Sequence, residues 1–333
     1  MKLIIQIPCL NEEQTLPITL NDLPKKIKGI DVIEYLIIDD GSTDRTVEVA
    51  KQCGVHHIVR FPRNRGLAAA FRAGIDACLR LGADIIVNTD ADNQYCGADI
   101  PKLIQPILEG KAEMVVGDRE TDNIPHFSRT KKMLQKFGSW VVNKAANADI
   151  SDTTSGFRAY SREAAMRLNV VSEFSYTLET IIQAGREKMA TANVPIRTNG
   201  VLRESRLFKS IRGYVQRSMN TIIRTYTMYR PLQVFLTIGA ILAMAGFALF
   251  VRYLYFYITG NGQGHVQSLI LGSSLLVVGF QVGLIGLVAD LIANNRKLLE
   301  EALYRIKKME YDQLNGAEKL EAQDHPNRKM TAM

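Results

Sequence analysis

The sequence predicts an α/β domain with a mainly parallel sheet, followed by two membrane-spanning helices. Apolar, β-prone runs at residues 2–9, 33–38 and 85–88 alternate with helix-like segments such as residues 67–81. This order is typical of a parallel sheet covered by helices. Two nearly charge-free runs, residues 231–257 and 266–290, each reach the roughly 20 residues needed to cross a bilayer. Acidic clusters follow the strand-like runs, where ligands bind in such sheets.

Composition and charge divide the 333 residues into segments. Basic side chains gather at residues 197–230, next to the first apolar run. A basic cluster beside a membrane attracts anionic lipid, so the net charge of +7 indicates a membrane rather than nucleic acid. The expected organisation is a soluble domain (1–200), a basic amphipathic juxtamembrane segment (201–230), membrane helices (231–257 and 266–290), a cytoplasmic amphipathic helix (291–314) and a disordered polar tail (315–333).

The charges that flank the apolar runs predict the topology. Arg217, Arg224 and Arg230 precede the first run, Arg296 and Lys297 follow the second, and the connector at 260–265 has no Lys or Arg. Because positive loops stay inside, the soluble domain and both termini are expected in the cytoplasm of a two-span membrane protein. Gly279 and Gly283 form a GxxxG pair, which would support packing within one chain or a homo-oligomer.

The cysteines and the N-terminus exclude two other classes of protein. The four cysteines lack paired metal-ligand spacing and lie in segments typical of a reduced domain, so neither disulfides nor zinc are expected. The apolar run at the N-terminus stops at charges and has no small-residue cleavage site. It is therefore interpreted as a first strand and not as a signal peptide.

Three acidic clusters carry the candidate chemistry. They are Asn11-Glu12-Glu13, Asp39-Asp40-Gly41-Ser42 and Asp90-Ala91-Asp92. Any one of them is explained as a turn or a helix cap, whereas three at successive strand ends indicate a convergent polar site. The two carboxylates of the last cluster suit Mg²⁺ or Mn²⁺, which prefer oxygen ligands and bridge diphosphates.

Six motifs in order carry a family resemblance. They are IPCLNEE, LIIDDGSTDRT, RNRGLAAAFRAG, TDADNQY, VVGDRE and DTTSGFRAYSREA. Over residues 1–200 the chain resembles family 2 glycosyltransferases of the GT-A fold (Rossmann-like, with a mainly parallel sheet). In particular, it resembles polyprenyl-phosphate members similar to dolichol-phosphate mannose synthase. The two C-terminal spans are similar to those of bacterial polyprenyl-phosphate glucosyltransferases.

The resemblance implies a role for each matching residue. Asp92, Arg119 and Asp152 are implied in catalysis, and Asp90 and Asp92 in holding Mg²⁺ or Mn²⁺. Nucleotide-sugar binding is implied for Pro8, Glu12, Asp39, Asp40, Asp90, Gln94 and Glu179. Lipid-phosphate binding is implied for Arg129, Arg203, Arg206 and Lys209.

Several of these roles have alternatives. Asp152 would act as a base, orient a substrate, or simply cap a turn. Glu179 would contact sugar hydroxyls or lie as an ordinary carboxylate on a helix surface. The basic segment reads RESRL where the family commonly has Gly-Glu-Ser-Lys, so the division of labour among its cations, between acceptor phosphate and membrane lipids, stays open.

The resemblance implies metal-dependent, inverting transfer of a sugar from a UDP- or GDP-linked donor to a polyprenyl (undecaprenyl or dolichyl) phosphate. The alternatives are another lipid or polysaccharide acceptor, or a non-catalytic membrane scaffold. A nicotinamide-binding dehydrogenase is disfavoured because no GxGxxG follows the first strand.

Overall fold

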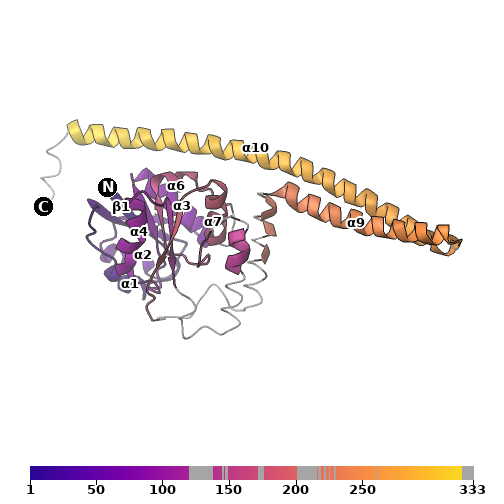
Figure 1. Cartoon of the computed structure of the whole chain (residues 1–333). Coiled ribbons are helices and arrows are strands. Elements are labelled where there is room, and N and C mark those ends of the chain that lie inside the picture. Colours follow the sequence, from indigo (N-terminus) through magenta and orange to yellow (C-terminus); the bar gives the residue numbers. More distant parts are fainter. Residues whose placement is uncertain are drawn as a thin grey trace. The chain divides into compact units, whose positions relative to one another are not determined.

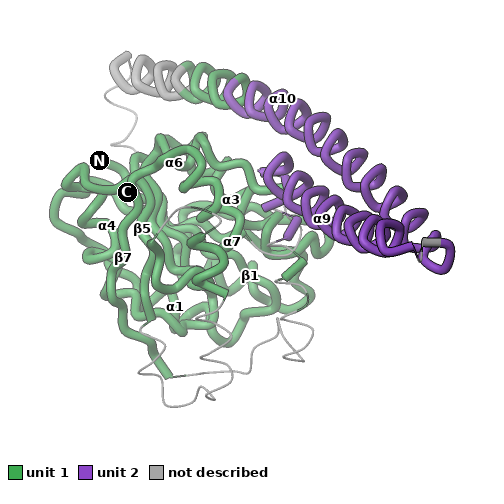
Figure 2. The backbone as a smooth tube through the Cα atoms, turned by 45° about the vertical axis from the view of Figure 1, so that its right-hand side comes forward, with its two compact units in different colours: residues 1–222, 302–333 green, residues 223–301 purple. Residues whose placement is uncertain are grey.

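The computed structural model describes residues 1–119, 138–144, 146, 149–171, 176–200, 216, 219–220, 223–224, 226–228, 230–260 and 262–324. At residues 262, 312 and 314–324 the description is limited to the backbone. Two compact units divide the chain: unit 1 comprises residues 1–222 and 302–333, and unit 2 comprises residues 223–301 (Figure 2).

Unit 1 contains a seven-stranded sheet in the order β3-β2-β1-β4-β6-β5-β7. The strands are β1 (Lys2–Cys9), β2 (Val32–Asp39), β3 (His57–Arg60), β4 (Ile85–Asn88), β5 (Met114–Asp118), β6 (Arg158–Ser161) and β7 (Thr191–Pro195). β6 runs antiparallel to β4 and β5, and the other pairings are parallel. The predicted, mainly parallel sheet is confirmed.

Helices cover both faces of this sheet (Figure 1). Leu3, Ile5 and Ile7 belong to a core cluster that includes residues of α1 and α4. Side chains alternate along a strand, so Gln6 faces the other side, where it lies against Gly74 of α3. The helices of unit 1 within residues 1–200 are α1 (Leu16–Asp22), α2 (Thr46–Gln52), α3 (Leu67–Arg80), the 3₁₀ turn η1 (Gly97–Asp99), α4 (Ile100–Leu108), α6 (Arg162–Arg167) and α7 (Tyr176–Arg186).

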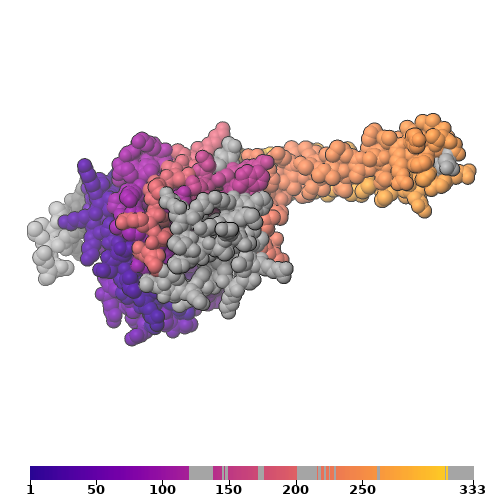
Figure 3. All heavy atoms as spheres, turned by 60° about the horizontal axis from the view of Figure 1, so that its bottom comes forward, coloured from indigo at the N-terminus to yellow at the C-terminus, as the bar shows by residue number. Residues whose placement is uncertain are grey.

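Unit 2 is a hairpin of two apolar helices (Figure 2), and its surface is slender in the space-filling view (Figure 3). It contains α9 (Pro231–Ile258), the 3₁₀ turn η3 (Gly262–His265) and the first part of α10 (Val266–Asp324). Both helices are long and apolar enough to cross a membrane. At about 1.5 Å per residue, the 28 residues of α9 exceed the thickness of a bilayer core.

Glycines bring the two helices of unit 2 into backbone contact. A Cβ atom on Gly239 would lie 2.7 Å from the carbonyl oxygen of Gly279, and one on Gly246 would lie 2.7 Å from that of Gly272. Gly279 of the GxxxG pair therefore faces α9 of its own chain. This contact accounts for the glycine without a second copy of the protein.

Helix α10 is longer than the sequence indicates. It continues without a break from the second apolar run through residues 291–314 and on to Asp324, where composition predicts a tail beginning at residue 315. The added turns are rich in Ala, Leu, Glu and Lys, which favour helix. From Ala302 the helix belongs to unit 1.

Candidate functional site

The carboxyl ends of β1, β2 and β4 lie side by side at one edge of the sheet. β1 pairs in parallel with both other strands, with Cys9 opposite Asp39 and Gln6 opposite Asn88. Pro8 is buried opposite Ile38. The three acidic clusters therefore leave the sheet at the same edge, as expected for a ligand site in a parallel sheet.

Asp39 is a fully buried carboxylate with one committed oxygen. Its Oδ1 accepts a hydrogen bond of 3.0 Å from the Ser42 backbone N–H. Its Oδ2 lies 3.2 Å from Nε of Arg60 but makes no hydrogen bond among the described residues. A buried acceptor without a hydrogen bond is costly, so this oxygen is the part of Asp39 suited to a donor group of a ligand.

Asp40 holds a loop rather than presenting its oxygens. Its Oδ1 accepts from the Arg65 N–H at 2.7 Å and its Oδ2 from the Gly66 N–H at 2.9 Å. Burial raises the pKa of Asp40 in spite of these two donors. Gly41 lies beneath this loop with φ +77°, and a Cβ there would meet the Arg63 carbonyl carbon at 2.5 Å. Asp40 thus fixes the RNRG loop beside Asp39.

Glu12 also makes contacts inside the protein. Its Oε2 accepts from the Thr15 hydroxyl at 2.6 Å, and its backbone N–H donates to the Thr46 hydroxyl at 2.8 Å. The side chain is 5% exposed. These contacts join the turn after β1 to the start of α2, which positions the backbone around the predicted nucleoside site.

Asp90 and Asp92 are half-buried in the loop after β4. A Cβ on Gly156 would lie 3.1 Å from Oδ2 of Asp90, so this carboxylate stands against the DTTSGFR loop. Oδ1 of Asp92 accepts from the Gln94 N–H at 3.2 Å. Asn93 between them has φ 56°, a left-handed conformation that Asn tolerates.

The donor set of this loop fits Mg²⁺ or Mn²⁺ and does not form a closed protein cage. Among the residues with described positions, no cluster of three or more His, Cys, Asp or Glu side chains could hold a metal. Hard cations of this kind are typically bound by one or two carboxylates together with water and substrate phosphates. Asp90 and Asp92 could supply that partial shell.

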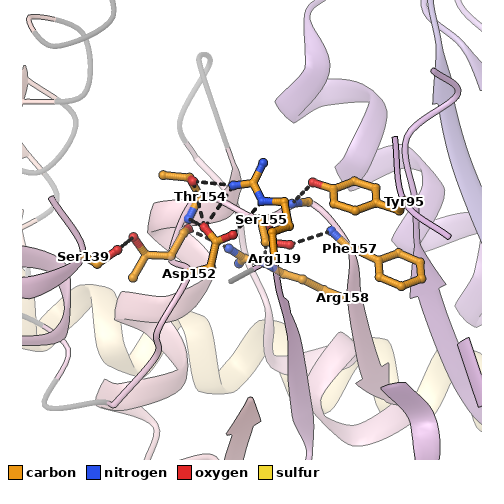
Figure 4. A network of polar contacts seen from close by, with 10 residues as sticks. Tyr95, Arg119, Ser139, Asp152, Thr154, Ser155, Phe157 and Arg158 are labelled. Carbon is orange, nitrogen blue, oxygen red and sulfur yellow. Dashed lines mark hydrogen bonds and ion pairs between the residues drawn. The ribbon is translucent and has the colours of Figure 1, made fainter. Parts of the chain in front are cut away.

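Arg119 and Asp152 form a two-pronged ion pair (Figure 4). Nε of Arg119 lies 2.6 Å from Oδ2 of Asp152, and Nη2 lies 3.0 Å from Oδ1. Nη2 also donates to the Thr154 hydroxyl at 2.8 Å. The exposed fractions are 17% for Arg119 and 2% for Asp152. The guanidinium is therefore held rigidly at the carboxyl end of β5.

The charge state of Asp152 bears on whether this residue acts as a base or as an orienting group. Burial raises the pKa of Asp152, but the Arg119 guanidinium and the hydrogen bonds from Thr154 outweigh burial, and the net pKa is lowered. A carboxylate of this kind is a weak proton acceptor near neutral pH. The geometry favours Asp152 as the residue that orients Arg119.

Sequence reasoning missed the residues that shape the DTTSGFR loop. Arg158 is fully buried and donates to Thr153 O at 2.9 Å, to Ser155 O at 2.8 Å and to Thr177 O at 2.8 Å. An arginine inside the apolar strand FRAY was the available signal. Its bonds join the loop to α7 and hold the loop in one conformation.

Tyr95 and Asn88 hold the same loop from the side of β4 and the loop that follows it. Burial raises the pKa of Tyr95 to about 12, so its hydroxyl stays neutral. That hydroxyl accepts from the Gly156 N–H at 2.9 Å, and Nδ2 of Asn88 donates to the Gly156 carbonyl at 2.9 Å. Gly156 is thereby fixed from both sides next to Asp90.

Glu179 is buried, with 1% of its surface exposed, whereas a helix-surface carboxylate was the default expectation. Both of its oxygens accept from the Val171 N–H at 3.1 Å, and Nε2 of Gln183 lies 3.4 Å from Oε1. Glu179 therefore caps the chain that precedes α7. These contacts give it an internal role that needs no sugar.

Residues 196–199 form a strap that is hydrogen-bonded to the loop after β4. The Asn199 N–H donates to the Gln94 carbonyl at 2.9 Å, and the Cys96 N–H donates to the Arg197 carbonyl at 3.2 Å. Asp99, which is fully buried, accepts from the Arg197 backbone at 2.7 Å and from its Nη2 at 2.8 Å. Gln94 is thus held through its backbone.

The implied lipid-phosphate residues Arg129, Arg203, Arg206 and Lys209 lie outside the described residues.

Similarity to known proteins extends over this whole region. The profile of the family "Glycosyl transferase family 2" matches residues 4–168. A UDP-N-acetylglucosamine–dolichyl-phosphate N-acetylglucosaminyltransferase of Methanococcus voltae is 31% identical over 219 residues, 58% of this chain and 83% of the relative. An undecaprenyl-phosphate mannosyltransferase of Micrococcus luteus is 27% identical over 207 residues, 59% of this chain and 83% of the relative.

A solved structure shares the fold. It is glucosyl-3-phosphoglycerate synthase from Mycobacterium tuberculosis in complex with Mn²⁺, uridine diphosphate and phosphoglyceric acid. The TM-score is 0.52 at 19% identity, over 68% of this chain and 77% of that one. The similarities in sequence agree with the GT-A sheet and with the shared architecture. This chain belongs to glycosyl transferase family 2.

Proposed function

We propose that this glycosyltransferase moves a sugar from a UDP- or GDP-linked donor to a polyprenyl phosphate at the cytoplasmic face of a membrane, with inversion and with Mg²⁺ or Mn²⁺. The observation that carries the proposal is that Asp39, Asp90 and Arg119, which Asp152 holds, lie at or just after the carboxyl ends of β2, β4 and β5, at one edge of the same sheet. Two apolar helices in the same chain support a membrane-embedded acceptor.

The relatives support the acceptor and the donor. The names of the two curated relatives give dolichyl phosphate and undecaprenyl phosphate as acceptors. The structural neighbour was solved with Mn²⁺ and uridine diphosphate. Carried over to this chain, these names favour a polyprenyl phosphate and a nucleoside diphosphate sugar, and they leave the sugar itself open.

In the proposed mechanism the chain mainly binds and orients. Oδ2 of Asp39 would accept a hydrogen bond from the nucleobase. Arg119, already held by Asp152 and Thr154, would meet phosphate oxygens without reorganisation, which is how fixed charges stabilise a developing anion. Mg²⁺ or Mn²⁺ at Asp90 and Asp92 would neutralise charge on the departing diphosphate.

A separate general base is not required by this chemistry. The second pKa of a phosphate monoester is about 6, so the acceptor oxygen is largely anionic near neutral pH. Holding donor and acceptor in line then supplies much of the rate. This agrees with an Asp152 that is occupied by Arg119.

The test is sugar transfer by the purified full-length protein in vesicles. Undecaprenyl and dolichyl phosphate would be offered with a panel of UDP- and GDP-sugars, with Mg²⁺, Mn²⁺ or a chelator. We expect one donor to label the lipid, with loss of transfer in chelator. Asp92→Asn should lower turnover by orders of magnitude. Asp31→Asn, an exposed carboxylate with 83% of its side chain accessible, is the matched control.

Three outcomes would contradict the proposal. Transfer only to diacylglycerol, or only to a polysaccharide, would show that the acceptor is not a polyprenyl phosphate. Full activity in chelator, or in Asp92→Asn, would remove the metal site. A folded wild-type protein that transfers no sugar to any acceptor would support the scaffold alternative.

A further inference from the structure

Two tyrosines near the end of α10 are buried in unit 1. Tyr304 is 9% exposed and Tyr311 is 1% exposed, although the sequence around them, LYRIKKMEY, is highly charged. They are seven residues apart, which places them on the same face of a helix. Leu298, Ile306 and Met309 on the same helix are 70%, 56% and 60% exposed. The tyrosine face is therefore the one that packs.

Tyr304 binds an acid–arginine pair on α6. Its hydroxyl donates to Oε1 of Glu163 at 2.6 Å, the same oxygen that lies 3.0 Å from Nη2 of Arg167. The Arg167 guanidinium also lies over the Tyr304 ring, 4.2 Å from its centroid. Tyr304 thus makes a hydrogen bond to the carboxylate and a cation–π contact to its partner.

Tyr311 repeats this arrangement on α3. Its hydroxyl donates to Oδ1 of Asp76 at 2.5 Å, while Oδ2 of Asp76 accepts from Nε of Arg80 at 3.0 Å. Arg80 also pairs with Glu310 on α10 at 3.0 Å. Burial raises the pKa of Tyr311, and the bond to Asp76 adds to the rise. The hydroxyl therefore keeps its proton and stays a donor.

The repetition distinguishes this interface from an incidental contact. Asp76 and Arg80, like Glu163 and Arg167, stand four residues apart on their own helices, a spacing that also occurs on ordinary solvated surfaces. Here each pair receives one tyrosine hydroxyl. We call these six residues the tyrosine dock: Asp76, Arg80, Glu163, Arg167, Tyr304 and Tyr311.

The tyrosine dock joins two parts of the chain that serve different purposes. Residues up to 301 of α10 belong to unit 2 and include the second candidate membrane span. From Ala302 the same helix belongs to unit 1 with the glycosyltransferase site. Among the described residues, the dock therefore adds a non-covalent attachment to the covalent link that the chain entering α9 provides.

We propose that the tyrosine dock is a second tether, which restrains the catalytic unit so that its site meets a membrane-embedded acceptor productively. The consequence for the acceptor rests on the proposed function. A unit linked at one point samples many orientations, and a second attachment raises the effective concentration of the site at the acceptor. The dock should matter for an acceptor in a bilayer and not for one free in water.

The experiment uses the full-length protein in vesicles and the double variant Tyr304→Phe/Tyr311→Phe, which keeps both rings and removes both hydroxyls. Trypsin cleavage after Arg305, Lys307 or Lys308 reports undocking, since these sites lie between the tyrosines. Transfer is measured to undecaprenyl phosphate in the bilayer and to geranyl phosphate, a short water-soluble acceptor. Met309→Ala, on the exposed face, is the control.

We expect cleavage in the double variant to be about a hundredfold faster, since two hydrogen bonds to charged groups are lost and each carries about a tenfold factor. Transfer to undecaprenyl phosphate should fall several-fold, while transfer to geranyl phosphate and the KM for donor stay unchanged. Met309→Ala should match wild type in every assay.

Two results would overturn the tether. One is unchanged cleavage both in the double variant and in Asp76→Asn/Glu163→Gln, which would show that these contacts do not hold the helix. The other is faster cleavage with equal losses for both acceptors, which would leave the dock a purely structural role. A wild-type protein that transfers to neither acceptor would refute the proposed function instead, and the cleavage assay would still report on docking.

Discussion

Neighbouring carboxylates of the site do different work because their surroundings differ. Asp40 spends both oxygens on the N–H groups of Arg65 and Gly66, whereas Asp39 keeps one oxygen without a hydrogen bond among the described residues. Asp152 is tied to Arg119. Residue type alone marks all three as candidates. The partners of each oxygen distinguish a carboxylate that is suited to a ligand from carboxylates that hold other groups of the protein.

The first prediction concerns Asp152→Asn. The substitution removes the charge that holds Arg119, so we expect turnover to fall by about a hundredfold, as for loss of one stabilising donor. The shape of the pH profile between pH 5 and 8, a window far above the usual Asp value of about 3.9, should not change. Arg119→Lys, which cannot form the two-pronged pair, should show a similar loss. If the variant loses an acid limb present in wild type, Asp152 is a base.

The same group makes a stability prediction with a defined sign. The pKa of Asp152 is lowered on folding, so its contribution to the free energy of unfolding is present above the unfolded pKa of about 3.9. That contribution is lost as pH falls through the lower folded value. Wild type should therefore be more stable than Asp152→Asn at neutral pH in urea unfolding, and the gap should close below about pH 4.

The second prediction concerns Gly156→Ala. The added Cβ would lie 3.1 Å from Oδ2 of Asp90 and 3.0 Å from the Tyr176 hydroxyl, so one of them must move by a few tenths of an ångström. We expect turnover to fall about tenfold, since larger displacements of about 1 Å cost a hundredfold, together with a higher metal requirement. Gly200→Ala, whose Cβ meets nothing within 4 Å, is the control. Equal metal titrations would place Asp90 away from the metal.

At the scale of elements, the antiparallel strand β6 is what completes the site. It lies between β4 and β5 and starts at Arg158. The DTTSGFR loop leads directly into it and therefore runs past Asp90 and Arg119. If β6 ran parallel to β4 and β5, its N-terminal end, and with it this loop, would lie at the opposite edge of the sheet.

The third prediction concerns the strap, through Asp99. Burial raises the pKa of Asp99, but the Arg197 hydrogen bonds outweigh burial and lower it to about 2. Asp99→Asn should lower the free energy of unfolding by about 1 kcal/mol, less than the usual contribution of a hydrogen bond to a charged group, because the Arg197 side chain is 64% exposed and water screens the pair.

The pH dependence of this effect follows from the same pKa. The contribution of Asp99 is present above its unfolded pKa of about 3.9 and is lost as pH falls toward 2. Urea unfolding at neutral and acid pH measures it. Glu109→Gln, which breaks the exposed pair with Lys111, is the control and should change little. An equal effect at acid pH would contradict the ion-pair explanation.

At the scale of the whole molecule, the close packing of the two helices of unit 2 depends on glycines, which have no side chain at the contact. Gly239→Ala would place a Cβ 2.7 Å from the Gly279 carbonyl oxygen, and backbone cannot yield as a side chain can. The fourth prediction is a loss of about 1–3 kcal/mol, typical of overpacking, seen as a lower melting temperature in detergent. Gly264→Ala meets nothing within 4 Å and should be neutral. A Gly239→Ala variant as stable as wild type would contradict this backbone contact between the helices.

The fifth prediction tests the topology. If both ends of the chain are cytoplasmic, the connector lies outside. In intact cells an impermeant maleimide should label Gly264→Cys and spare Cys53, an exposed cysteine of unit 1. Inverted vesicles should show the opposite pattern. Labelling of both sites in intact cells would contradict two spans in this orientation.

Local pattern was sufficient to predict much of the molecule from its sequence. The runs at residues 2–9 and 85–88 coincide with β1 and β4, and the run at 67–81 with α3. The two apolar runs became helices long enough for a bilayer. These succeed because apolar periodicity and burial act over a few consecutive residues. The acidic clusters were identifiable for the same reason, since each directly follows a strand.

Which charged groups contact one another could be seen only in the folded structure. Arg119 and Asp152 are 33 residues apart, and Tyr311 and Asp76 are 235 apart. Arg158 looks like a surface charge in sequence, yet the carbonyls around it make a buried site for it. Glu179 is similar. The fold class, the apolar helices and the acidic strand ends could be predicted from local sequence patterns. The partner of each charge depends on contacts between distant segments, and no local pattern encodes them.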